Sequence, residues 1–130
     1  MCFMVTGIEH TAIATPDPMK LARWYVDRLG FVINWQPPDS STVFVKAPNG
    51  SMLELIEATA PLAAAPAMRE PGLRHLAIMV SDFEAMYRQL EAAGVKFLTA
   101  PEKVHGNSLA FFTDCDGNIL HLLHRETPLP

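Results

Sequence analysis

Hydrophobic positions along the first half of the chain alternate in short stretches and once follow a helical period. This pattern predicts a strand over residues 4–14 and then a helix that is capped by Asp17 and stopped by Gly30. Three further strands are predicted, over residues 31–35, 42–46 and 51–57.

The second half shows the same order of patterns. A strand is predicted over residues 72–80, followed by a helix that begins in a capping box of Ser81 and Glu84 and stops at Gly94. Three more strands follow, over residues 95–98, 108–113 and 118–124. Glycine-containing segments at 48–50 and 114–118 are typical of hairpin turns.

The two halves also match residue by residue. Residues 7–13 align with residues 72–78 at an offset of 65, so that Gly, His, Ala and Ile coincide, and Asp17 falls on Asp82. Near the end of each half the offset is 67, and residues 48–56 align with residues 115–123. The chain therefore contains two copies of one unit of about 65 residues.

These elements predict an α+β domain that covers residues 1–130 and consists of two βαβββ modules. The modules span about residues 4–57 and 72–125, and the Ala- and Pro-rich segment 58–71 joins them. Each predicted sheet has one face covered by a helix and one bare face. We expect the modules to pair about a pseudo-twofold axis, so that the curled mixed sheets form a cleft.

Strand alternation selects four candidate site residues. His10 and His75 share their strand faces with small or aliphatic residues, and Glu54 and His121 do the same on the last strand of each module. The repeat relates His10 to His75 and Glu54 to His121. A pseudo-twofold axis would therefore bring all four side chains together.

Imidazoles and a carboxylate on otherwise apolar strand faces predict a divalent-metal site. A bound ion would offset the cost of burying Glu54 and fix the imidazole tautomers. His105 and His124 lack repeat partners of this kind, and we expect both to face solvent.

Composition excludes several classes of protein. Ten Lys and Arg against fourteen Asp and Glu give a net charge of −4, which argues against nucleic-acid binding. No apolar run is long enough to span a bilayer, and the first ten residues do not resemble a secretory signal. Cys2 and Cys115 are predicted to be reduced thiols, because the chain is large enough to fold without a disulfide. We expect a cytoplasmic protein that contacts neither nucleic acid nor membrane.

The sequence resembles the vicinal oxygen chelate superfamily of glyoxalases, bleomycin resistance proteins and extradiol dioxygenases. The resemblance extends from Gly7 to about Arg125 and is carried by residues 8–13, 74–77 and 111–118. Members typically hold one divalent ion between paired βαβββ modules and bind two adjacent oxygens of a small substrate.

The resemblance implies that His10, Glu54, His75 and His121 are the metal ligands. It also implies a lyase or isomerase similar to lactoylglutathione lyase, with Glu54 as the residue that moves the proton. Many members carry Glu where this chain has His121. Three imidazoles and one carboxylate favour Zn, Ni, Co or Fe(II) over Mg.

Two alternative functions remain open. An Fe(II) extradiol-type dioxygenase would use the triad of His10, His75 and Glu54. A metal-free module that binds a drug of the bleomycin type would use aromatic residues instead. A phosphonate-antibiotic transferase is less favoured, because few cations lie near the final strand. In each case we expect a small-molecule ligand and a homodimer, with the four ligands supplied by one chain or by two.

Overall fold

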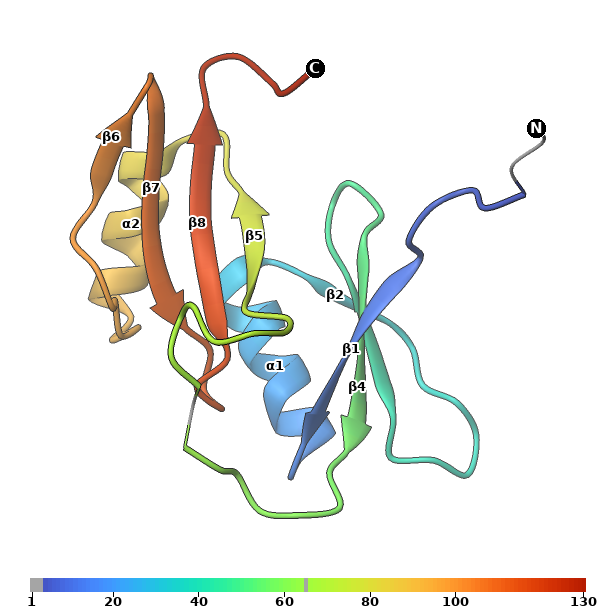
Figure 1. Ribbon diagram of the computed structural model, residues 1–130. Coiled ribbons are helices and arrows are strands. Elements are labelled where there is room, and N and C mark those ends of the chain that lie inside the picture. Colours follow the sequence, from blue (N-terminus) through green and yellow to red (C-terminus); the bar gives the residue numbers. More distant parts are fainter. Residues whose placement is uncertain (1–3, 65) are drawn as a thin grey trace. The chain divides into compact units, whose positions relative to one another are not determined.

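Two compact units make up the protein, and they divide after Leu62, within the segment predicted to be a linker. The computed structural model describes residues 4–64 and 66–130. Cys2 lies outside the described residues, whereas Cys115 is exposed in a turn of the second unit. Figure 1 shows that each unit contains one sheet and one helix. We call residues up to 62 unit 1 and the remainder unit 2.

Unit 1 follows the predicted βαβββ order. Its elements are β1 (His10–Thr15), α1 (Pro18–Leu29), β2 (Val32–Trp35), β3 (Val43–Lys46) and β4 (Met52–Glu57). The sheet has the order β1-β4-β3-β2, with β1 parallel to β4 and the other neighbours antiparallel.

Unit 2 repeats this topology. Its elements are β5 (His75–Met79), α2 (Phe83–Ala92), β6 (Glu102–Val104), β7 (Asn107–Thr113) and β8 (Ile119–Arg125). The strand order β5-β8-β7-β6 corresponds strand for strand to that of unit 1, again with only the first pair parallel. The predicted α+β fold of two βαβββ modules is confirmed. Among the described residues, neither helix has the length and apolar character that crossing a bilayer requires.

The two helices begin in the same way. Asp17 caps α1 by accepting a hydrogen bond from the Lys20 backbone amide at 3.1 Å. The capping box predicted for α2 is wrong, because Asp82 is the N-cap and accepts from the Ala85 amide at 3.0 Å. The repeat offset of 65 aligns Asp82 with Asp17. Both helices therefore use the repeat-equivalent aspartate as their N-cap, rather than the Ser81 predicted for α2.

Two strand predictions are wrong. The first strand begins at His10 rather than at residue 4, and residues 4–9 are exposed. The segment 95–98 forms a single bridge between Phe97 and Phe112, and the edge strand is β6 instead. The regular ladder is interrupted because the Phe111 amide donates to Thr99 Oγ1 at 3.0 Å rather than to a backbone carbonyl.

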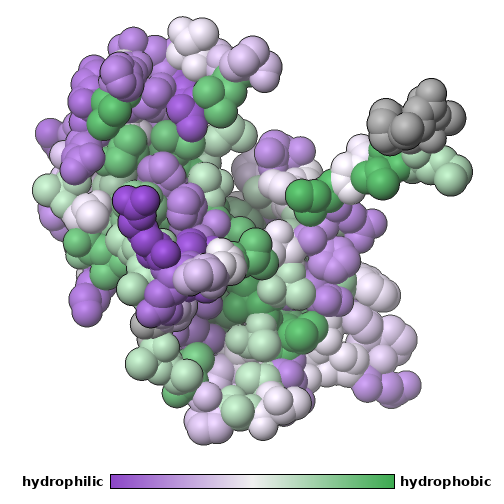
Figure 2. Space-filling model, in the orientation of Figure 1, coloured by the Kyte–Doolittle hydropathy of each residue, from purple (hydrophilic) through white to green (hydrophobic). Residues whose placement is uncertain are grey.

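The central strand of each sheet buries residues on its helix side, and in unit 2 Ile119 and Leu123 are also buried on the side that carries His121. Leu53 and Leu55 of β4 are buried, as are Leu120 and Leu122 of β8, and these residues form the core on the helix side. We call the opposite side the open face of each unit. On the visible side of unit 2, hydrophobic residues reach the surface between hydrophilic ones (Figure 2).

The β7–β8 turn fixes how the two long strands of unit 2 are joined. Asp114 is 4% exposed, and its carboxylate accepts from the Asp116 amide, the Asn118 amide and Asn118 Nδ2 at 2.8–3.0 Å. In the β3–β4 turn, Asn49 accepts from the Ser51 amide and hydroxyl, but this turn is exposed.

We therefore predict that Asp114→Ala lowers the free energy of unfolding by about 2 kcal/mol, because it leaves three part-buried donors without their acceptor. Equilibrium urea unfolding followed by circular dichroism measures this loss. Asn49→Ala is the matched control and should cost less than about 0.5 kcal/mol, as exposed substitutions usually do. Equal losses in the two variants would contradict the assignment of Asp114 as the stabilising group.

Candidate metal centre

In unit 1, strand register brings His10 and Glu54 together. Glu54 lies opposite Ala12 of β1 and opposite Phe44 of β3, so that it occupies the centre of the open face. His10 Nε2 is 3.7 Å from Glu54 Oε1, while His10 Nδ1 is 3.0 Å from Glu9 Oε1. The His10 and Glu54 side chains remain 34% and 28% exposed. An ion or substrate can therefore reach both from solvent.

In unit 2, the same register brings His75 and His121 together. His121 lies opposite Ala77 of β5 and opposite Phe111 of β7, the positions that correspond to the neighbours of Glu54. The ring centroids of His75 and His121 are 5.3 Å apart, and their planes are nearly perpendicular at 83°.

The His121 ring is partly removed from solvent. Its Nε2 is buried without a hydrogen-bond partner, one of two such side-chain atoms in the described part of the chain, the other being Arg74 Nε. Burial lowers the pKa of His121, and the charges of His75 and Arg125 lower it further. The imidazole is therefore neutral near pH 7 and keeps a nitrogen lone pair for a ligand.

Neither unit holds the whole predicted ligand set. The structure pairs His10 with Glu54 and His75 with His121, and these pairs occupy repeat-equivalent positions. Within the ranges that the structure describes, no three His, Cys, Asp or Glu side chains form a group suited to a metal ion. A common centre for all four residues stays a prediction.

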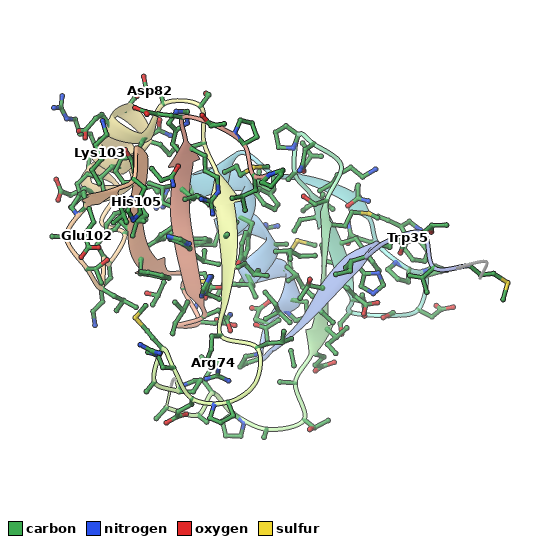
Figure 3. All side chains as sticks on the ribbon, turned by 45° about the horizontal axis from the view of Figure 1, so that its top comes forward. Trp35, Arg74, Asp82, Glu102, Lys103 and His105 are labelled. Carbon is green, nitrogen blue, oxygen red and sulfur yellow. The ribbon has the colours of Figure 1, made fainter. Side chains whose placement is uncertain are left out.

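The other two histidines differ from each other. His105 is exposed, as predicted, and it lies in the turn after β6, near Glu102 and Lys103 (Figure 3). His124 was predicted to face solvent, but this is wrong. It is half-buried, and its Nδ1 lies 2.9 Å from the Val80 carbonyl oxygen. His121 and His124 are three positions apart on β8, so their side chains lie on opposite faces of the sheet. His124 therefore lies on the helix side, where Val80, the residue after β5, supplies the hydrogen-bond partner.

Comparison with known protein families shows the family to which this chain belongs. The sequence matches the family model of the glyoxalase/bleomycin resistance protein/dioxygenase superfamily over residues 7–122. The chain belongs to this superfamily.

Three solved structures that are similar to this chain carry names with three different functions. The oxidase ChaP-H2 is 26% identical, with a TM-score of 0.74 and coverage of 94% of this chain and 95% of that one. The antibiotic-binding protein TnmS3 from Streptomyces sp. CB03234 is 24% identical, with a TM-score of 0.74 and coverage of 96% and 100%. The lactoylglutathione lyase from Agrobacterium tumefaciens is 19% identical, with a TM-score of 0.69 and coverage of 94% and 96%.

Comparison with functionally curated proteins gave no significant match.

Two aromatic residues contact the candidate ligands of this superfamily member, and sequence reasoning did not assign them to the site. Phe44 makes an edge contact with His10, with ring centroids 5.5 Å apart, and Phe111 stacks on His121 at 4.3 Å. The offset of 67 relates Phe44 to Phe111 as it relates Glu54 to His121, and this shared offset is the signal that could have identified them.

Proposed function

We propose that this superfamily member is a divalent-metal-dependent enzyme of the glyoxalase type, a lyase or isomerase. Its substrate would be a small carbonyl or hydroxy-acid compound with two adjacent oxygens. The observation that supports the proposal most strongly is the buried His121 Nε2, which has no hydrogen-bond partner among the described residues and lies beside a second imidazole. A buried polar atom of this kind is costly unless a ligand satisfies it.

The proposed ligands of one ion are His10, Glu54, His75 and His121, which the repeat relates in two pairs, His10 to His75 and Glu54 to His121. Three imidazoles and one carboxylate suit Zn, Ni, Co or Fe(II) better than Mg, which prefers oxygen ligands. Such an ion would polarise a substrate carbonyl and make the neighbouring C–H bond more acidic.

Glu54 is the proposed proton carrier, because it is the carboxylate within the ligand set. Its side chain is partly exposed and lies between Phe44 and Ala12 on the open face. One carboxylate oxygen would take the proton from the carbon that carries the hydroxyl oxygen, next to the carbonyl carbon, and then return it to the product.

A second candidate function is metal-free binding of a flat molecule, and Trp35 favours it. An irregularity in β2 between Ile33 and Trp35 places Trp35 opposite Phe44, where regular pairing would have placed Asn34. Trp35 (Figure 3) is 55% exposed, and its ring centroid lies 5.4 Å from that of Phe44. An exposed indole next to a second ring can stack on an aromatic ligand.

We predict that the purified protein binds Ni²⁺ and Zn²⁺ and that His121→Ala weakens this binding by about 100-fold, because a ligand is lost. Isothermal titration calorimetry measures the affinity. The control is His105→Asn, which replaces an exposed histidine at a positive φ that Asn tolerates and should bind as wild type does. If wild-type protein binds no ion but an aromatic ligand quenches its tryptophan fluorescence, and Trp35→Leu removes this quenching, the second candidate replaces the first.

We predict that Glu54→Gln lowers turnover by at least about 100-fold while the metal-loaded protein stays folded, because the amide cannot accept the proton. Two probes are used with Ni²⁺-loaded protein: hydroxyacetone in D₂O, followed by NMR, and the hemithioacetal of methylglyoxal and glutathione. Full turnover in Glu54→Gln would refute the role of Glu54. Oxygen uptake with catechol and Fe²⁺, without proton exchange in either probe, would indicate the dioxygenase instead.

We also propose a homodimer. Within the described sheets, β1 and β5 are edge strands that pair on one side only, and edge strands are commonly covered by a second chain. Sedimentation equilibrium should therefore give a mass twice that of the 14.3 kDa chain. A mass of one chain across the micromolar range would rule the dimer out.

A further inference from the structure

Three rings form a cluster on the open face of unit 2. Phe111 and His121 are directly paired across β7 and β8, and their rings are stacked, with centroids 4.3 Å apart and planes 8° from parallel. His75 meets both rings edge-on, at 5.3 Å from Phe111 and 5.3 Å from His121. Phe111 therefore touches both candidate ligands of this unit.

The two units orient their candidate ligands by different means. In unit 1, His10 Nδ1 lies 3.0 Å from a Glu9 carboxylate oxygen, which fixes the ring as hydrogen bonds usually fix metal-binding imidazoles. The structure gives the His121 ring no hydrogen bond to any described residue, and its Nε2 is buried. Rotation of an imidazole about its last side-chain bond is otherwise broad, so something else must hold this ring.

A parallel stack can hold the His121 ring. Rotation of the imidazole out of the stack would drive its edge into the face of Phe111. The stack therefore allows the ring only two orientations, which share one plane and differ by a rotation of about 180°. The nitrogen lone pairs lie in the imidazole plane and therefore point past Phe111 rather than into it. A branched aliphatic residue would fill the same volume but would present no flat surface.

We propose that Phe111 is a positioning residue that orients His121, and through the edge contacts His75, in place of hydrogen bonds. The role of these imidazoles as metal ligands rests on the function proposed above. The orientation of the rings does not depend on it, so the two claims can be tested separately.

Proton NMR of the metal-free protein tests the orientation. The carbon-bound ring protons of His121 should be shifted upfield by the ring current of Phe111, and Phe111→Leu should remove this shift, whereas Phe111→Tyr should preserve it. Phe44→Leu is the matched control, because it removes the repeat-equivalent ring from the other unit and should leave the His121 signals unchanged. Circular dichroism checks that each variant is folded. Unshifted His121 signals in the wild type, or a shift that persists in Phe111→Leu, would overturn the proposal.

Titration with Co²⁺ tests whether the orientation matters for binding. Phe111→Leu should weaken Co²⁺ binding by about tenfold, as loss of an orienting neighbour does, and Phe111→Tyr should restore it to within about twofold. Unchanged affinity in a folded Phe111→Leu variant would show that Phe111 does not position the ligands for metal. If the ring-current shift behaves as expected but the wild type binds no Co²⁺, the positioning claim stands and the proposed metal function fails.

Discussion

Burial of two leucines on each central strand is the constraint on which the site depends. Leu53 and Leu55 face the helix side of unit 1, and Leu120 and Leu122 do the same in unit 2. Because side chains alternate along a strand, this burial forces the residue between each pair of leucines onto the open face. A slip of one residue would turn Glu54 or His121 toward the helix and remove the leucines from the helix-side core. The hydrophobic core therefore sets the direction of the candidate ligands.

Duplication conserves this geometry but not its chemistry. Glu54 and His121 have equivalent strand partners, and each lies opposite a phenylalanine on one side and an alanine on the other. Unit 1 nevertheless presents an imidazole beside a carboxylate, whereas unit 2 presents two imidazoles. Under the proposed function, the same scaffold would supply a proton carrier from one unit and neutral ligands from the other.

The sequence predicted those features that depend on short-range rules. The Asp17 cap and the two hairpin turns follow from local spacing, and both are confirmed. The edge strand of unit 2 was misplaced because the Thr99 side chain takes the Phe111 amide, a contact between residues twelve positions apart. The ring stack on His121 escaped prediction for a similar reason, since it depends on the register between β7 and β8. Local patterns thus specify which way a side chain points but not which neighbour it meets.

The contrast between the two pairs also bears on electrostatics. Unit 1 places Glu9 and Glu54 on either side of the His10 ring, within 3.0 and 3.7 Å of its nitrogens. Unit 2 surrounds His121 with a phenylalanine ring, a second imidazole and the positive field of Arg125. Anionic oxygens attract a cation over a longer range than neutral nitrogens do, since charge–charge attraction falls more slowly with distance than charge–dipole attraction. If both pairs serve one ion, unit 1 would supply most of the long-range attraction, and the oriented imidazoles of unit 2 would supply the preference for a borderline metal.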